Sequence, residues 1–136
     1  MASDQLLPEF LDHCRARGLR VTRERRSVFL ALGEAGGPVT RPALLRRLLA
    51  EGMHAPTLYR TIDVFVANQI VQPVSRNGES AYELLPPFAR HHHHFHCLSC
   101  GAVSALQAAD EHIDLQVPGK ALYHQIDVYG ICGGCL

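Results

Sequence analysis

The cysteines form the most specific chemical pattern in the chain. Four of the five lie in two pairs, Cys97-x-x-Cys100 and Cys132-x-x-Cys135. A two-residue spacing lets one tight turn direct both thiolates at one ion, and two such pairs complete a tetrahedral shell of four sulfur ligands. The sequence therefore predicts one Zn²⁺ ion held by all four thiolates. The alternative is two separate redox sites, which is disfavoured because a thioredoxin-like pair opens a helix and Gly133-Gly134 does not.

A run of histidines precedes the first cysteine pair and occupies His91, His92, His93, His94 and His96. Successive side chains of a strand point to opposite faces, so His92 and His94 would share one face and His91 and His93 the other. The run therefore predicts two separate metal half-sites. Imidazole suits zinc, iron, nickel and copper, so these ligands do not choose the metal. The alternative is a solvated polar strand edge.

Arginines and one short motif point to nucleic acid. Six of the twelve residues from Arg15 to Arg26 are arginine, which supplies phosphate contacts. Thr57-Leu58-Tyr59-Arg60 opens a predicted helix, and in a helix-turn-helix the first residues of the second helix meet the major groove. Arg60 would pair with guanine, while Thr57 or Tyr59 would contact phosphate or a thymine methyl. The alternative is that the arginines lie on an ordinary solvated surface.

The periodicity of apolar residues predicts the elements that carry these groups. Residues 5–17 and 56–68 have helical spacing, and two further helices begin at the capping residues Thr22 and Thr40. Strands at residues 70–75 and 81–84 flank Asn77-Gly78, a strong hairpin turn. Helices followed by a hairpin predict a winged helix-turn-helix.

The rest of the chain predicts a small domain built on strands. Pro86-Pro87 reads as a linker, since two prolines stiffen the chain and block helix before them. Strands are predicted at residues 92–98, 101–106 and 122–129, and the last has alternating apolar residues. At most a short helix fits between the second and third of these strands.

Composition places the chain among globular proteins of one domain or two very small ones. It has 136 residues, of which 47% are hydrophobic, and 13 basic residues balance 13 acidic ones. The charges are uneven: residues 1–80 hold eleven arginines against eight acids, and residues 81–136 hold two bases against five acids. No apolar run is long enough for a membrane span and the start lacks a signal peptide, so we expect a cytoplasmic protein with no membrane partner.

Four motifs occur in a specific order: Gly18-Leu19-Arg20-Val21-Thr22-x-x-Arg25, Thr57-Leu58-Tyr59-Arg60-Thr61, His91-His92-His93-His94-x-x-Cys97-x-x-Cys100-Gly101-x-Val103 and Tyr129-Gly130-x-Cys132-x-x-Cys135. With them the chain resembles the ferric uptake regulator family of metal-dependent bacterial repressors over nearly its whole length. The resemblance implies an α+β chain: a winged helix-turn-helix DNA-binding domain at residues 1–85 and a small α/β, metal-binding dimerisation domain at residues 86–136. It implies a homodimer that binds double-stranded operator DNA when loaded with metal and represses metal-uptake genes, not an enzyme.

The same resemblance assigns roles to individual residues. It implies that Arg20 enters a minor groove and that Tyr59 and Arg60 contact DNA. It implies three metal sites: structural zinc at Cys97, Cys100, Cys132 and Cys135; a sensory site that joins the two domains at Glu83, His92 and His94; and a second dimerisation-domain site at His91, His93 and His124, with His112 as its fourth ligand.

Two departures from the family bear on the sensed metal. Many members have His where this chain has Pro38 and Glu where it has Ala105, so the sensory site needs a ligand from elsewhere. Ala55-Pro56-Thr57 resembles the zinc-uptake subgroup, and the histidine run lacks an Asp that would suit iron or manganese. We therefore favour Zn²⁺ over Fe²⁺ as the regulatory metal. A peroxide-sensing relative, a metal buffer and a thiol oxidoreductase are the alternative functions.

Overall fold

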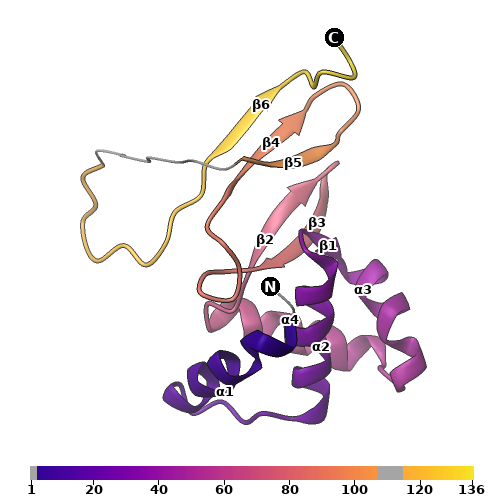
Figure 1. The fold of residues 1–136 in the computed structure, drawn as a ribbon, viewed down its shortest axis with the longest axis vertical. Coiled ribbons are helices and arrows are strands. Elements are labelled where there is room, and N and C mark those ends of the chain that lie inside the picture. The colour runs from indigo at the N-terminus through magenta and orange to yellow at the C-terminus, as the bar shows by residue number, and fades with distance from the viewer. Residues whose placement is uncertain (1–2, 107–114) are drawn as a thin grey trace. The chain divides into compact units, whose positions relative to one another are not determined.

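Local capping residues set where two of the helices begin. Thr22 Oγ1 accepts a hydrogen bond from the backbone N–H of Arg25 at 3.1 Å, and Thr40 Oγ1 accepts one from Ala43 at 3.3 Å. Each bond satisfies an N–H group that the first turn of a helix leaves unpaired. The computed structural model describes residues 3–106 and 115–136. Its helices (Figure 1) are α1 (Leu7–Ala16), α2 (Arg23–Ala35), α3 (Arg41–Leu48) and α4 (Ala55–Ala67), with 3-10 turns η1 (Ser3–Leu6) and η2 (Leu49–Glu51).

A three-stranded antiparallel sheet follows the helices, in the order β1-β3-β2. Its strands are β1 (Val39–Thr40), β2 (Val71–Arg76) and β3 (Glu79–Leu84). Asn77 and Gly78 join β2 to β3 with φ angles of 52° and 74°. Positive φ at both central residues is what the favoured two-residue hairpin turn requires, so the predicted hairpin is present. The two-residue strand β1 was not predicted.

An aromatic cluster forms the centre of the first part of the chain. Phe10 of α1 stacks on Phe29 of α2 with ring centroids 4.2 Å apart, and Phe65 of α4 meets Phe10 edge-on at 5.8 Å. All three are fully buried. Burial of each ring contributes about 1.5–3 kcal/mol, so this cluster holds α4 against the other helices.

The chain divides into two compact units, residues 1–90 and 91–136. The sequence placed the boundary at residue 85, before Pro86-Pro87. The structure carries the first unit further because Phe88 joins the aromatic cluster, with its ring 5.4 Å from Phe29 and 6.4 Å from Phe10. The two prolines therefore lie inside the first unit rather than between the units.

The second unit is a three-stranded sheet in the order β5-β4-β6. The strands are β4 (His93–Cys97), β5 (Val103–Leu106) and β6 (Asp127–Gly130). The central strand β4 runs antiparallel to β5 and parallel to β6, and its His94 has Ala105 on one side and Asp127 on the other.

The prediction of a strand over residues 122–129 was wrong for its first half. Strand β6 begins at Asp127, and Leu122 is 69% exposed. Alternating apolar residues suggested a longer strand. However, β4 begins at His93, so the described residues before Asp127 have no strand beside them to pair with. The short helix expected before this strand falls largely on residues 107–114, outside the described residues.

None of the helices that the structure describes combines the length and the apolar character needed to cross a lipid bilayer.

Candidate metal centres and nucleic-acid interface

The second unit brings all four paired cysteines together. Cys97 ends β4, Cys132 follows β6, and the parallel register sets Cys97 opposite Gly130. The four sulfur atoms lie within 4.8 Å of one another, and those of Cys100 and Cys132 are 3.8 Å apart. Two sulfurs on one tetrahedral zinc ion, each at about 2.3 Å, lie about 3.8 Å apart. The residues therefore fit a tetrahedral thiolate site.

Backbone hydrogen bonds favour the ionised form of one thiol of this cluster. The N–H groups of Cys100 and Cys132 donate to Cys97 Sγ at 3.5 and 3.3 Å, and they lower the pKa of Cys97 to about 6. A hydrogen bond with the Cys132 side chain, foremost among several contacts, raises the pKa of Cys135 to about 12. The raised pKa keeps Cys135 protonated at neutral pH when no cation is present, whereas a bound cation deprotonates its thiol ligands.

One group of histidines lies on one side of β4. The ring of His91 lies 4.7 Å from that of His93 and 4.8 Å from that of His124, and His93 stacks on His124 at 5.4 Å. The backbone N–H of Ile126 donates to His93 Nδ1 at 3.0 Å and holds that ring in place. Each histidine offers a nitrogen within 4.8 Å of the others. The predicted fourth ligand, His112, lies outside the described residues.

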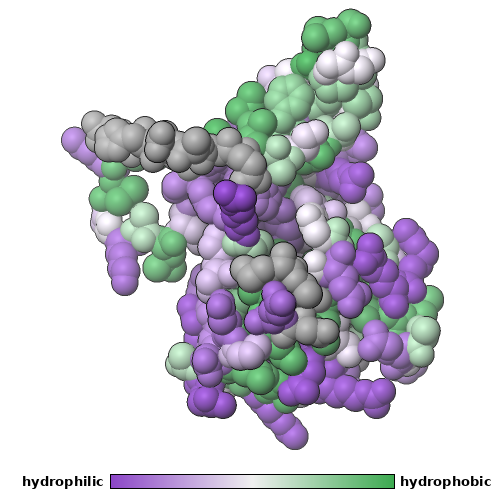
Figure 2. Space-filling model, viewed as in Figure 1, coloured by the Kyte–Doolittle hydropathy of each residue, from purple (hydrophilic) through white to green (hydrophobic). Residues whose placement is uncertain are grey.

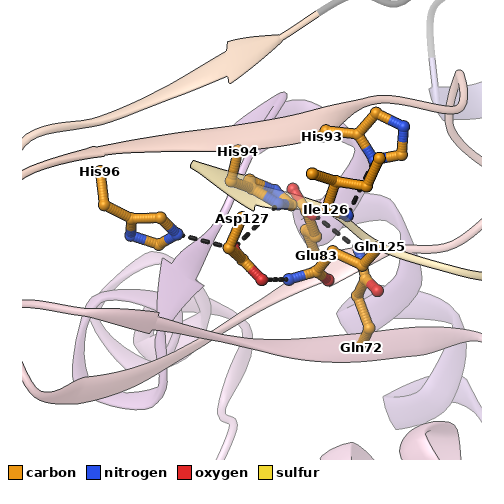
Figure 3. Close-up of polar contacts among 8 residues, drawn as sticks. All are labelled: Gln72, Glu83, His93, His94, His96, Gln125, Ile126 and Asp127. Carbon is orange, nitrogen blue, oxygen red and sulfur yellow. Dashed lines mark hydrogen bonds and ion pairs between the residues drawn. The ribbon is translucent and has the colours of Figure 1, made fainter. Parts of the chain in front are cut away.

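The alternate histidines form a second group. His92 and His94 have ring centroids 4.9 Å apart, and the side chain of His94 is 1% exposed. This grouping is the one that strand alternation predicts. Glu83, the third predicted residue of this site, lies on β3 of the first unit, where it is 3% exposed and accepts a hydrogen bond from Gln72 Nε2 at 2.9 Å (Figure 3). Its partnership with the two histidines stays a prediction.

Asp127 lies beside the second histidine group and was missed by sequence reasoning. Its Oδ1 accepts a hydrogen bond from His96 Nε2 at 2.7 Å, and its Oδ2 accepts one from Gln125 Nε2 at 2.8 Å. His94 Nδ1 is 3.9 Å from the same Oδ1 (Figure 3). Burial alone would raise the pKa of Asp127, but these hydrogen bonds and the positive charge of His96 and His94 lower it below its usual value.

His96 is the fifth histidine of the run, and the sequence analysis assigned it no role. It is 9% exposed and stacks on Tyr129 with ring centroids 4.7 Å apart and an interplanar angle of 14°. The parallel register sets His96 opposite Tyr129 and His94 opposite Asp127. In the sequence, His94 and His96 are two positions apart, and so are Asp127 and Tyr129. This equal spacing is the only feature of the sequence that points to the pairing.

Helix α4 presents the motif predicted to meet DNA. Its buried face carries Leu58, Ile62 and Phe65, each 0% exposed, as the apolar stripe predicted. Arg60 is exposed, and Thr57 and Tyr59 are half-buried. Arg20, between α1 and α2, is also exposed. The helix therefore directs Arg60 outward while its opposite face holds the core.

An arginine of α3 steadies the tyrosine of this motif. The Arg41 guanidinium lies over the ring of Tyr59 at 5.2 Å and over that of Tyr82 at 5.0 Å. Its Nη2 also pairs with Asp63 Oδ1 at 2.8 Å. Arg41 therefore ties α3, α4 and β3 together around Tyr59, an arrangement that the sequence did not reveal.

Comparisons with known proteins give one family. Residues 16–127 match the family model described as "Ferric uptake regulator family". The chain is 33% identical over 86 residues to the ferric uptake regulation protein of Bacillus subtilis (strain 168), and the match covers 58% of this chain and 58% of that protein. The aligned part thus spans little more than half the length of this curated relative.

Solved structures share the fold. The ferric uptake regulator of Pseudomonas aeruginosa with manganese matches with a TM-score of 0.71 at 19% identity, over 90% of this chain and 96% of that one. The Helicobacter pylori ferric uptake regulator matches with a TM-score of 0.68 at 16% identity, over 99% and 94%. A zinc uptake regulator complexed with zinc and DNA matches with a TM-score of 0.66 at 23% identity, over 99% and 95%. The predicted α+β class is confirmed.

Proposed function

Because the chain belongs to the ferric uptake regulator family, we propose that it is a metal-dependent transcriptional repressor, a homodimer that binds double-stranded operator DNA when loaded with metal. The observation that carries this proposal is the clustering of a four-thiolate group and two histidine groups around one small sheet. A chain that combines so many metal-ligand side chains with a helix that exposes Arg60 suits a metal sensor better than a catalyst.

The four thiolates serve as the structural zinc site in this proposal. Cys97 and Cys100 flank the turn after β4, while Cys132 and Cys135 follow β6. Joined through one Zn²⁺ ion, these turns would tie the ends of two neighbouring strands. Because such a site exists only in the folded chain, the ion's binding free energy stabilises the fold.

Metal sensing is assigned to Glu83, His92 and His94, as the family resemblance implies. Zn²⁺ is the favoured regulatory metal and Fe²⁺ the second candidate. Binding of the metal would select the conformer that fits DNA. By linkage, the metal would tighten DNA binding and DNA would tighten metal binding by the same factor. His91, His93 and His124, with His112 as their proposed partner, form the further site.

DNA recognition is assigned to Arg20, Thr57, Tyr59 and Arg60. The exposed position of Arg60 on α4 supports a contact with a base edge, for which Arg to guanine is the commonest pairing. Eleven arginines in residues 1–80 supply the sequence-independent attraction to phosphate.

Exposed apolar residues of the second unit support a homodimer. Figure 2 shows hydrophobic side chains around β4, β5, β6 and the segment after β6. Leu98 is 70% exposed, Tyr129 60%, Ile131 44% and Leu136 94%. Apolar side chains that gather in one region of a surface mark a protein interface more often than scattered ones do. A two-fold dimer would present two α4 helices to a palindromic operator.

Selection from a random pool of DNA duplexes tests the proposal. The zinc-loaded protein is mixed with the pool in the presence of Zn²⁺, Fe²⁺ or Mn²⁺, and the enriched duplexes are sequenced. We expect a palindrome whose binding, measured by fluorescence anisotropy, is lost when a chelator removes the regulatory metal. If no duplex is enriched with any of the three metals, the chain is a metal buffer rather than a repressor.

A further inference from the structure

The face of the second sheet that carries His94 also carries a carboxylate that the sequence pattern did not predict. Asp127 lies opposite His94 in the parallel pairing of β6 with β4, so both side chains leave the sheet on the same face. The other neighbour of His94, Ala105 on β5, has no ligand atom. The carboxylate comes from a strand more than thirty positions away in the sequence, which is why the histidine run seemed to lack an oxygen ligand.

The spacing of His94 and Asp127 is close to that of two ligands on one ion. His94 Nδ1 and Asp127 Oδ1 are 3.9 Å apart, and the rings of His92 and His94 are 4.9 Å apart. A nitrogen and an oxygen on one tetrahedral ion, each at about 2.0–2.2 Å, lie about 3.4 Å apart. A small rotation of either side chain closes this difference. Asp127 therefore lies close to ligand range of an ion bound at His94 Nδ1.

The surroundings of Asp127 are those of a metal-binding carboxylate. His96 Nε2 donates to Oδ1 at 2.7 Å and Gln125 Nε2 donates to Oδ2 at 2.8 Å (Figure 3). Each carboxylate oxygen has a second lone pair, so both keep the capacity to bind a cation. Hydrogen bonds from outer residues orient ligating carboxylates in metal sites. The stacking of His96 on Tyr129 in turn holds the imidazole that donates to Asp127.

We propose that Asp127 is a ligand of the regulatory metal together with His92 and His94, and that His96 positions its carboxylate. This inference rests on the proposed function, because it concerns the metal that controls DNA binding. It would add a fourth ligand, and a second carboxylate, to the site assigned to Glu83, His92 and His94. Carboxylate suits manganese and other hard ions better than imidazole does, so Asp127 widens the range of metals that the site accepts.

Cobalt binding to the zinc-loaded protein tests this assignment. Co²⁺ alone is titrated into the protein, and its visible absorption spectrum reports the ligand set while competition with a chelator reports affinity. All proteins carry His124→Ala, which disables the other histidine group at an exposed position. Asp127→Asn keeps a hydrogen-bond acceptor for His96 but removes the charge. Asp12→Asn makes the same change at an exposed position on α1 and is the matched control.

The expected results separate a ligand from a supporting residue. Asp127→Asn should change the cobalt spectrum and weaken the affinity for Co²⁺. Loss of an outer hydrogen bond weakens metal affinity by about 10–100-fold, and loss of a ligand should weaken it by more. His96→Gln should weaken affinity by about 10–100-fold and leave the spectrum as in the His124→Ala parent. Asp12→Asn should match the parent. The zinc of the four thiolates should stay bound in every variant.

An unchanged cobalt spectrum in Asp127→Asn would overturn the proposal, whatever the affinity, because a lost ligand must alter the spectrum. Failure of the proposed function looks different. In that case the zinc-loaded wild-type protein, with all its histidines, would bind no Co²⁺, or it would bind Co²⁺ without any change in its affinity for DNA.

Discussion

Replacement of Arg41 by methionine removes the guanidinium beside Tyr59 while keeping a long aliphatic side chain. The cation lies 5.2 Å from the Tyr59 ring and 5.0 Å from the Tyr82 ring. Each contact of this kind at a partly exposed site contributes about 0.5–1 kcal/mol. The ion pair with Asp63 adds at most about 1 kcal/mol, since its two side chains are 31% and 69% exposed.

The expected loss is therefore about 1–3 kcal/mol of unfolding free energy in the first unit. For a unit of this size, each kcal/mol lowers the melting temperature by about 4–8 °C. Urea unfolding followed by circular dichroism measures the first quantity, and a thermal scan measures the second. Binding to a selected operator duplex should also weaken, because Tyr59 loses the guanidinium of α3 that holds its ring in place.

Arg46→Met is the matched control, since Arg46 lies exposed on the same helix and its loss changes the net charge equally. Sequence-independent attraction to phosphate falls by the same amount in both variants. Any additional loss in Arg41→Met therefore reports the contacts with the two tyrosines and with Asp63. Equal stability and equal DNA affinity of the two variants would refute the reasoning.

Four other outcomes follow from the described geometry. Arg60→Ala should weaken operator binding by about 1–3 kcal/mol in an anisotropy titration while zinc content and dimerisation stay unchanged. Cys97→Ser should release zinc, seen by elemental analysis, and monomerise or unfold the second unit; a dimer that keeps its zinc would contradict the shared site. Because the folded pKa of Cys97 is lowered from 9.0 to about 6, its contribution to stability is fully present only above pH 9 and is lost as pH falls through about 6. In metal-free protein, alkylation of Cys97 should accordingly show a midpoint near pH 6. His92→Ala should abolish metal-dependent DNA binding whereas His91→Ala should alter stability or tune the response, and identical behaviour of the two would contradict the two-face arrangement of β4.

Local features of the sequence predicted the elements of the first unit well. Thr22 and Thr40 cap helices because a threonine hydroxyl reaches an N–H group only three residues ahead. Asn77-Gly78 forms the hairpin turn because both residues accept positive φ. The two-residue spacing of the cysteines and the alternation of the histidines are local in the same sense. Each of these predictions needed only the geometry of a few neighbouring residues.

The sequence misjudged features that depend on distant partners. Strand β6 starts at Asp127 rather than near residue 122, because its length is set by the backbone that β4 offers for pairing. The first unit includes Phe88 because the rings of α1 and α2 leave a place for it. No pattern within either segment contains this information.

The amino-acid sequence thus determined which ligand types this protein has and which face of a strand each occupies. Tertiary structure alone decided that Asp127 stands beside His94 and that Arg41 lies between Tyr59 and Tyr82. The physical reason is that parallel strand register and side-chain packing arise from contacts between segments far apart in the chain. In a sequence, an aspartate or an arginine looks the same whether its side chain is solvated or packs against a residue from a distant segment.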